Sequence, residues 1–367
     1  MIVQFSSFDK KLMSRLIRTS LNYKGKTGKN PVVGAAVVKD GIIISTGYHE
    51  YEGGNHAEIN AINKASVTKD CDLYVTLEPC THHGKTPPCA AAILAHKFKS
   101  VYYAIHDPSP KIKKKPSKSI LNKIRLYSGL CATDALLAND VFFKNQLENK
   151  PFVHCKVGVS LDGFMALENY ESKYITNTPA QKYAHLLRAH YDAILVGART
   201  IIEDRPKLTL RFNYIKNGYQ SPHVIIFDPK SILTDQDLRA FSAGVTIIQG
   251  KNSQITCSDV DIIHTNYHAI DWDNILKQLF KKNIYSILLE GGCYTISSMY
   301  SQKEIDKLSY IISPKIIGGS LGVQPFSKTN PVPSLDKLSP LQHSKFRKFQ
   351  DNILIEGYIK DVNLWKT

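Results

Sequence analysis

The sequence contains no long hydrophobic run and no targeting pattern. No stretch of about 18 apolar residues occurs in it, which excludes an ordinary membrane-spanning helix. Its first residues lack an apolar block followed by a small-residue cleavage site, so they do not resemble a signal peptide. Internal repeats and low-complexity tracts are absent as well, which argues against a repeat architecture. We expect a cytoplasmic protein.

A disulfide framework is also missing. The seven cysteines are odd in number and scattered between residues 71 and 293, unlike the paired cysteines of small secreted domains. We expect reduced thiols, most of them small buried hydrophobic side chains. Cys80 and Cys89 are exceptions, because they share the segment LEPCTHHGKTPPCA, residues 77–90, with two adjacent histidines and three prolines.

Acidic residues are scarce relative to basic ones. The chain has 47 Lys and Arg against 32 Asp and Glu, a formal charge of +15, and its pI is near 9.3. This excess suits nucleic acid, an anionic membrane or a phosphorylated small substrate, and charge alone does not choose among them. The densest cluster, KIKKKPSKS at 111–119, is interpreted as a solvated loop.

The length of 367 residues predicts two domains, since one domain commonly spans roughly 100 to 200 residues. Apolar residues at 8–21 recur at helical spacing, and segments at 31–105 alternate between strand-like and helix-like patterns. This alternation indicates a layered α/β sheet. The segment 133–150 reads as a helix, so we expect a boundary near 147–151 and domains at 1–148 and 149–367.

The second half predicts another α/β domain. It opens with the strand PFVHCKVGVS and continues to a helix with Thr178 as N-cap and Pro179 at its first position. A later helix is capped by Asp271. Short apolar strands are expected at AILVG, HVIIFD, VTIIQ, DIIHT, SILLE and LSYIIS. The apolar C-terminal strands, including NILIEGYIKDV, are candidates for pairing across a subunit interface.

Three residues are candidate ligands of one zinc ion. His56 stands at the start of the predicted helix HAEINAINKA, Cys80 follows the strand CDLYVTL, and Cys89 opens the next helix. Helix N-termini favour thiolates, which are metal ligands. One His and two Cys leave the fourth tetrahedral position to water, as in catalytic zinc sites.

Glu58 follows the first ligand by two residues and is the candidate catalytic residue. Zinc lowers the pKa of its water to about 7, and Glu58 can take the water proton and return it to a departing amine. The H-x-E and P-C elements match the zinc deaminase pattern, although eight residues separate the two cysteines here. The alternative is a closed structural site with His82 or His83 as fourth ligand.

With these motifs, the sequence resembles the bifunctional deaminase-reductase family of riboflavin biosynthesis over essentially the whole chain. The N-terminal motifs are NPVVGAAVVKDG, GYHEYEGGNHAEINA and LYVTLEPCTHHGKTPPC. The resemblance implies a cytidine-deaminase-like three-layer αβα domain. It also implies a phosphorylated diaminopyrimidine substrate, 2,5-diamino-6-ribosylamino-4(3H)-pyrimidinone 5′-phosphate, with Asn30 and His82 among the residues that contact it.

The second half resembles the reductase domain of the same family through KVGVSLDG, ESKYIT, RAHYDAILVGART, PKLTLR and LLEGG. The resemblance implies a dihydrofolate-reductase-like α/β fold that uses NADPH to reduce a ribosyl group to ribityl. The residues implied to lie along NADPH are Gly158, Tyr174, Thr200, Asp204, Gly292, Cys293, Tyr294, Thr295, Ile296, Ser297 and Ser298. Those implied to hold the substrate are Ser172, Arg188, Leu208, Arg211 and Glu290.

The chain departs from the family pattern at four points. Tyr174 replaces a tryptophan, Arg205 an acidic residue and Ser109 an asparagine, and lysines replace glycines at 111–115. Two alternatives stay open beside the two-step enzyme, the first because of the basic charge and the zinc motif, the second because of Tyr174 and Arg205. One is a nucleic-acid base deaminase with a basic accessory domain, and the other is a deaminase joined to a non-catalytic reductase-like scaffold. We expect a homo-oligomer, a dimer or a tetramer, with no nucleic-acid or membrane partner.

Overall fold

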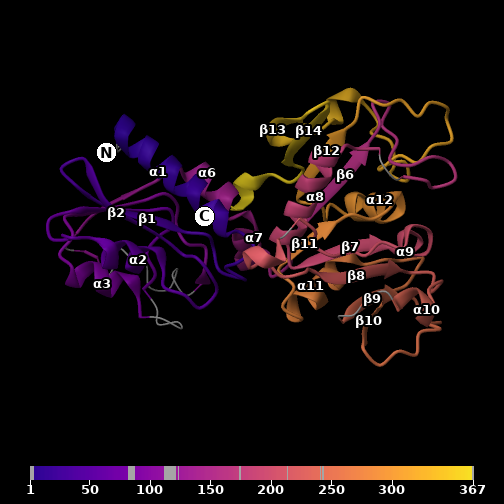
Figure 1. Ribbon diagram of the computed structural model, residues 1–367, viewed down its shortest axis with the longest axis horizontal. Coiled ribbons are helices and arrows are strands. Elements are labelled where there is room, and N and C mark those ends of the chain that lie inside the picture. Colours follow the sequence, from indigo (N-terminus) through magenta and orange to yellow (C-terminus); the bar gives the residue numbers. More distant parts are fainter. Residues whose placement is uncertain are drawn as a thin grey trace. The chain divides into compact units, whose positions relative to one another are not determined.

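The computed structural model describes residues 4–81, 87–110, 121–122, 124–172, 175–212, 214–239, 241 and 244–365 (Figure 1). The chain divides into two compact units, Met1–Asn149 with Leu364–Thr367, and Lys150–Asn363. None of the described helices has the length and apolar composition needed to cross a bilayer. The lysine-rich segment at 111–119 lies outside the described residues.

The first unit is built on a five-stranded sheet with the order β2-β1-β3-β4-β5. Its strands are β1 (Gly34–Lys39), β2 (Ile42–Tyr48), β3 (Asp72–Val75), β4 (Ser100–Tyr103) and β5 (Arg125–Ser128). β1 pairs antiparallel with β2 and β3, whereas β3, β4 and β5 run parallel. β1 and β2 form a hairpin around Asp40 and Gly41, and both residues have positive φ, as a tight two-residue hairpin turn requires.

Helices cover both faces of this sheet. They are α1 (Ser7–Ser20), α2 (Ala57–Lys64), α3 (Cys89–Ala95), α6 (Ala132–Ala138) and α7 (Asp140–Glu148). α1 contacts β1, β3 and α6, while α2 contacts β1, β2 and α3. In Figure 1, α1 and α6 lie on one side of β1 and β2, and α2 and α3 lie on the other. The predicted three-layer αβα architecture is confirmed.

Gly47 allows the closest of these contacts. A Cβ atom at Gly47 would lie 2.2 Å from the backbone nitrogen of Ala61 and 2.4 Å from the carbonyl oxygen of Ala57. These are backbone atoms of α2 that cannot yield without moving the helix. The missing side chain therefore sets how near α2, with His56 as its N-cap, approaches β2.

The prediction of one helix over 133–150 is wrong, because α6 and α7 are separate helices that meet at Asn139. The Asn139 side chain accepts a hydrogen bond from the Val32 N–H over 2.8 Å and donates one to the Val32 carbonyl over 3.0 Å. Asn139 is buried, so these bonds satisfy backbone groups that would otherwise be costly to bury.

The second unit contains a nine-stranded sheet with the order β10-β9-β8-β7-β11-β6-β12-β14-β13. All pairs from β10 to β12 are parallel, and the last two pairs are antiparallel. The strands are β6 (Phe152–Val159), β7 (Ala193–Gly197), β8 (His223–Asp228), β9 (Val245–Gln249), β10 (Val260–His264), β11 (Ser286–Leu289), β12 (Lys307–Ile312), β13 (Gln342–Phe349) and β14 (Asn352–Tyr358).

Helices and short 3-10 turns complete the secondary structure. The helices of this unit are α8 (Thr178–His190), α9 (Ala198–Asp204), α10 (Asp235–Leu238), α11 (Trp272–Lys281) and α12 (Cys293–Ser301). The 3-10 turns among the described residues are η1 (Leu21–Tyr23), η2 (Ile215–Asn217), η3 (Leu335–Lys337) and η4 (Val362–Trp365). The unit has the predicted α/β fold.

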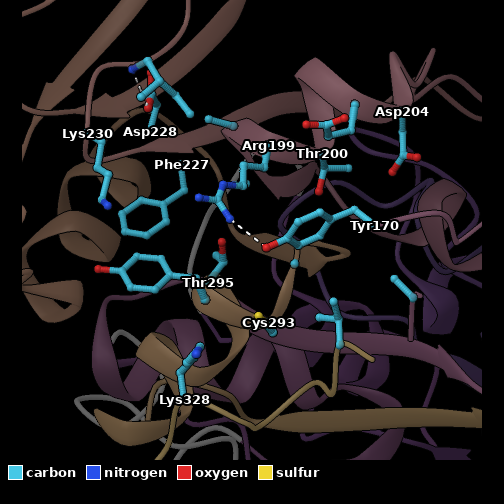
Figure 2. A pocket seen from close by; sticks show the side chains of 18 of the residues that line it. Tyr170, Arg199, Thr200, Asp204, Phe227, Asp228, Lys230, Cys293, Thr295 and Lys328 are labelled. Atoms are coloured by element: carbon cyan, nitrogen blue, oxygen red, sulfur yellow. Dashed lines mark hydrogen bonds between the residues drawn. The ribbon is translucent and has the colours of Figure 1, made fainter. Parts of the chain in front are cut away.

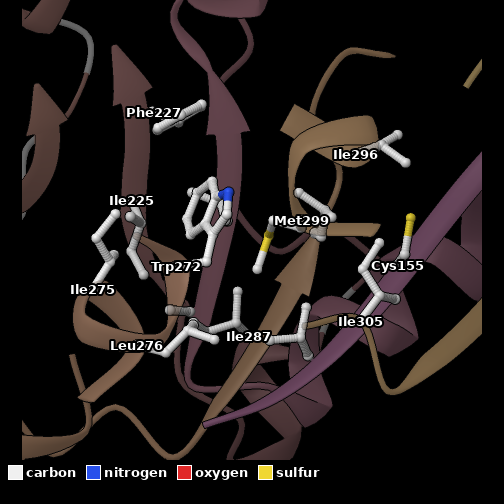
Figure 3. Packing of buried hydrophobic residues seen from close by; sticks show 14 of the residues in the cluster. Cys155, Ile225, Phe227, Trp272, Ile275, Leu276, Ile287, Ile296, Met299 and Ile305 are labelled. Atoms are coloured by element: carbon white, nitrogen blue, oxygen red, sulfur yellow. The ribbon is translucent and has the colours of Figure 1, made fainter. Parts of the chain in front are cut away.

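Trp272 anchors the core of this unit (Figure 3). It is fully buried, lies between Phe227 and Met299, and its ring centroid is 4.7 Å from that of Phe227. Its indole N–H donates to Ser298 Oγ over 2.8 Å. Large aromatic side chains contribute strongly to core stability when their polar atom has a partner, so Trp272 joins α11 to α12.

Two details of the second half differ from the sequence predictions. Asn177, not Thr178, is the N-cap of α8, and its side chain accepts from the Ala180 N–H over 3.0 Å. The C-terminal strand β14 lies between β12 and β13, so both of its edges are paired within the chain. Pairing of that strand across a subunit interface is therefore wrong. The Asp271 cap is confirmed by a 3.0 Å bond from the Asn274 N–H.

Candidate active sites

His56, Cys80 and Cys89 meet in the first unit. One ligand atom of each lies within 4.8 Å of the others. His56 Nδ1 is 3.2 Å from Cys89 Sγ and 3.5 Å from Cys80 Sγ, and the backbone N–H of Cys89 donates to Cys80 Sγ over 3.2 Å. The start of α2 supplies the histidine, the loop after β3 supplies Cys80, and the first residue of α3 supplies Cys89.

The pKa values of the two cysteines are shifted in opposite directions. A hydrogen bond from the Cys89 thiol, followed by one from His56, lowers the pKa of Cys80 to about 4. The same bond to Cys80, with burial, raises the pKa of Cys89. A thiolate, a second sulfur and an imidazole form the donor set that zinc prefers. The residues present therefore fit zinc, and no further ligand joins them among the described residues. His82 and His83 lie outside the described residues.

A cavity of about 460 Å³ opens beside this cluster. His56, Glu58 and Cys80 line it together with Asn30, which the sequence had assigned to the substrate. Glu58 is buried in the first turn of α2. Burial, with the nearby charge of Cys80, raises the pKa of Glu58 to about 7.

Several further polar residues line this cavity and were not singled out from the sequence, among them His49, Glu78 and Asp107. His49 Nδ1 is 3.0 Å from the Asn55 carbonyl oxygen. Glu78 accepts from His106 Nδ1 over 3.0 Å, and burial raises the pKa of Asp107 to about 6. His49 and Glu78 lie in two motifs that carried the family resemblance, GYHEYEGGNHAEINA and LYVTLEPCTHHGKTPPC, and Asp107 lies two residues before Ser109. Their positions in these segments were the sequence feature that could have identified them.

The second unit holds a cavity of about 400 Å³ (Figure 2). It is lined by seven residues that the sequence assigned to NADPH or substrate: Ser172, Thr200, Asp204, Gly292, Cys293, Tyr294 and Thr295. Two glycines allow the backbone segments beside this cavity to pack closely against one another. A Cβ atom at Gly291 would lie 3.1 Å from the Gly197 nitrogen, and one at Gly197 would lie 3.1 Å from Thr295 Oγ1.

Other predicted cofactor residues do not present side chains to this cavity. Ile296 is buried in the core, Ser297 Oγ accepts from the Lys328 N–H, and Ser298 Oγ accepts from Trp272. Gly158 lies against Thr176, whose Cγ2 would be 2.9 Å from an added Cβ atom. Tyr174 lies outside the described residues.

Glu290 binds two cations at the end of β11. Arg188 donates to both of its oxygens over 2.7 and 3.0 Å, and Lys156 Nζ lies 3.0 Å away. Burial alone would raise the pKa of Glu290, but the charges of Arg188 and Lys156 hold it well below its ordinary value. The sequence singled out Arg188 and Glu290 but missed Lys156. Leu208 is buried and Arg211 is exposed, and neither lines the cavity described above.

Comparison with known proteins decides the family. The model of the RibD C-terminal domain matches residues 151–354, more than half of the chain. The chain belongs to the RibD family. Residues 6–105 match the cytidine and deoxycytidylate deaminase zinc-binding region. The riboflavin biosynthesis protein RibD of Aquifex aeolicus is 36% identical over 86% of this chain and 89% of its own length, and that of Bacillus amyloliquefaciens is 32% identical over 95% and 96%.

A solved RibD-type structure covers nearly the whole chain. The diaminohydroxyphosphoribosylaminopyrimidine deaminase/5-amino-6-(5-phosphoribosylamino)uracil reductase of Thermotoga maritima has a TM-score of 0.84, 30% identity, and covers 96% of this chain and 98% of its own. The chain is therefore a bifunctional RibD deaminase and reductase of riboflavin biosynthesis that uses zinc and NADPH. A nucleic-acid base deaminase with an accessory domain does not account for a RibD match that spans both units.

Proposed function

We propose that His56, Cys80 and Cys89 hold the zinc ion and that Glu58 moves the proton during deamination of the phosphorylated diaminopyrimidine. The observation that carries this proposal is the meeting of the three ligand atoms within 4.8 Å, beside a cavity that Glu58 also lines. Zinc held there lowers the pKa of water to about 7.

Glu58 is suited to return a proton as well as to take one. Its carboxyl is buried and belongs to α2, which Gly47 seats against β2, so its position relative to His56 is fixed by the fold. A fixed carboxylate can accept the proton of the attacking water and deliver it to the departing ammonia. Asn30 at the cavity wall offers amide donors and an acceptor to the pyrimidine ring.

In the second unit, we infer that NADPH occupies the cavity between Thr200, Asp204 and the first turn of α12. The backbone N–H groups from Cys293 to Thr295 form the first turn of α12, so they have no hydrogen-bond acceptor within the helix. Such groups suit the phosphates of a cofactor in the cavity that these residues line. NADPH supplies the hydride, while the protein supplies alignment and exclusion of water.

Glu290 then organises the substrate side of the reductase. Arg188 and Lys156 keep its carboxylate charged and fix its orientation. A charged carboxylate retains lone pairs that accept hydrogen bonds from sugar hydroxyls, so Glu290 suits the ribose of the deaminated intermediate. Ser172 lines the neighbouring cavity wall, and the exposed Arg211 offers paired donors to the substrate phosphate.

Coupled turnover tests the proposal. Purified protein given the diaminopyrimidine phosphate and NADPH should release ammonia and consume NADPH, and omission of NADPH should stop the reaction at the deaminated intermediate. Glu58→Gln should lower ammonia release by roughly 100- to 10,000-fold. The same variant should bind zinc and reduce the separately supplied intermediate like the wild type. Undiminished ammonia release would refute the role of Glu58.

We also propose a cytoplasmic location and a homo-oligomeric state. The location is supported by seven cysteines that are all free thiols. An oligomer is supported by the edge strand β13, on which Phe346 is 71% exposed. Light scattering of the purified protein measures the state, and a monomeric mass would refute the second proposal.

A further inference from the structure

We propose that Lys230 and Tyr267 bind the 2′-phosphate at the adenosine end of NADPH and make the reductase select NADPH over NADH. This inference rests on the proposed position of NADPH in the second unit. It identifies the residues that bind the 2′-phosphate, the one group by which NADPH differs from NADH.

The cavity extends from the first turn of α12 to the turn that follows β8. Gly292 and Thr295 line one part of it, and Phe227, Lys230 and Ile232 line another. Figure 2 shows Lys230 and Phe227 on one side of the cavity and Thr200 and Asp204 on the opposite side. A dinucleotide whose phosphates lie at α12 therefore has room for its adenosine beside Lys230. Ligands of open α/β sheets bind outside the carboxyl ends of the strands, where both parts lie.

Aromatic rings provide an apolar surface at this end. Phe227 and Tyr294 stack with their planes 11° apart and centroids 6.1 Å apart, and Tyr294 and Tyr267 stack at 6.3 Å. Tyr294 is 41% exposed, so part of this surface is open to a ligand. Stacking on such rings accepts an adenine without regard to the 2′ position of the ribose. Discrimination must come from another group.

Lys230 is that group. Its ammonium lies 4.8 Å from the ring centroid of Tyr267, which orients the side chain without neutralising its charge. Within the described part of the chain, no carboxylate forms an ion pair with Lys230. A phosphate monoester carries a charge of roughly −1.5 to −2 at pH 7. Lys230 can therefore form a charge-assisted hydrogen bond with the 2′-phosphate of NADPH, which NADH lacks.

The acidic residue next to this turn is bonded to the backbone of the turn. Asp228 is buried, and its two carboxylate oxygens accept from the backbone N–H groups of Ile232 and Leu233 over 3.0 and 2.9 Å. These bonds close the turn that presents Lys230. An aspartate free to meet the ribose hydroxyls would favour NADH, whereas here each carboxylate oxygen of Asp228 is held by a backbone N–H group of the turn.

A second cavity shares this corner. Pro229, Lys230 and Tyr267 line both cavities, and Lys251 and His264 line the second one alone. Lys251 is exposed and is not a wall of the first cavity. It provides a matched lysine with which to separate a specific contact from the general effect of one positive charge.

Direct binding tests the inference. Calorimetric titration of the full-length protein should be carried out with NADPH, NADH, 2′,5′-ADP and 5′-AMP. Lys230→Gln should weaken NADPH and 2′,5′-ADP by roughly 10- to 100-fold, the size of one charge-assisted hydrogen bond, and change NADH and 5′-AMP less than about twofold. Tyr267→Leu should weaken all four adenine-containing ligands through lost stacking, with a larger loss for NADPH and 2′,5′-ADP than for NADH and 5′-AMP. Lys251→Gln should leave the NADPH to NADH ratio unchanged.

Other outcomes overturn the assignment. Unchanged NADPH affinity in Lys230→Gln, or an equal loss for NADPH and NADH, would refute it. So would a loss of preference in Arg199→Gln but not in Lys230→Gln, because Arg199, bonded to the Tyr170 hydroxyl, lines the same cavity. A wild-type protein that binds NADH but not NADPH would contradict this inference alone. One that binds neither would contradict the proposed cofactor site as well.

Discussion

The deaminase and reductase sites are built in different ways. The proposed zinc ligands come from one stretch between residues 56 and 89, at the ends of consecutive elements. The Glu290 cluster joins Lys156, Arg188 and Glu290 from three distant segments. The first site consists of soft ligands that a metal ion would bind. The second consists of one carboxylate and two cations that form ion pairs in a buried position.

The difference explains what each site needs from the fold. Cys155 on β6 pairs with Leu289 on β11 in a parallel register, so the next residues, Lys156 and Glu290, become neighbours. A slip of one residue would send the side chains to opposite faces of the sheet. The register of β6 and β11 therefore determines which residues meet in the reductase cluster. The zinc cluster instead depends on the spacing of residues within local motifs and on the close packing of α2 against Gly47.

Metal removal should separate the two sites most strongly. A chelator should lower ammonia release by about a thousandfold or more, because Lewis acidity contributes several kcal/mol to the reaction. Reduction of the separately supplied intermediate should stay unchanged, since the second unit's cluster contains no soft ligand. Zinc content by atomic absorption and both rates, before and after zinc is restored, check this. A parallel loss of reduction would contradict the independence of the sites.

Glu290→Gln should have the opposite selectivity. It leaves Arg188 and Lys156 without their charged partner, which should lower reduction roughly 100-fold and destabilise the second unit by about 3 kcal/mol. Ammonia release should be unaffected. Denaturant unfolding followed by Trp272 fluorescence in a Trp365→Phe background reports this unit, because the chain has only two tryptophans.

The matched control for that substitution is Asp261→Asn. Asp261 pairs with Lys282 over 3.1 Å, but its side chain is 57% exposed. Exposed pairs contribute little, so the change should stay below about 1 kcal/mol. Equal effects of the two substitutions would show that burial of the Glu290 cluster has no energetic role.

Gly47→Ala should damage the deaminase unit through packing alone. The added methyl group overlaps the backbone of α2, which should cost about 3 kcal/mol and displace His56 and Glu58. Zinc content and ammonia release should fall, with reduction of the intermediate preserved. Gly244→Ala is the control, because its Cβ atom would meet nothing closer than 4.0 Å. Normal zinc binding by Gly47→Ala would contradict the close-packing argument.

The smallest expected effect is a pH dependence in the second unit. Burial, with the charge of Arg188 next, lowers the pKa of His185 to about 4. Above the unfolded pKa of about 6.5 both states are neutral and this contribution is fully present. As the pH falls, the unfolded state binds a proton that the folded state refuses, so stability decreases by roughly 2 kcal/mol between pH 6.5 and 5.

His185→Gln should remove this decrease. The difference in unfolding free energy between wild type and variant, measured by Trp272 fluorescence at pH 7, 6 and 5, isolates the histidine from other titrating groups. A constant difference across these pH values would show that His185 titrates normally in the folded protein.

Features encoded locally were predictable from the sequence. The meeting of His56, Cys80 and Cys89, the hairpin at Asp40 and Gly41 and the Asp271 cap all depend on residues close in the chain. The predictions were wrong where contacts between residues distant in the sequence determine the structure. The helix break at Asn139 follows from its bonds to Val32, and the inner position of β14 follows from β13 folding back beside it. Lys156 joined the Glu290 cluster only through strand register, which apolar patterning does not reveal.

The bonds between Asn139 and Val32 bear on how the first unit could be expressed alone. The stretch that matches the deaminase zinc-binding region stops at residue 105, before β5, α6 and Asn139. A fragment cut there would keep every zinc ligand yet leave the Val32 amide and carbonyl without these partners, and α1 without α6. The region that carries the recognisable chemistry is thus shorter than the region that can fold, and an autonomous deaminase fragment should extend through α7.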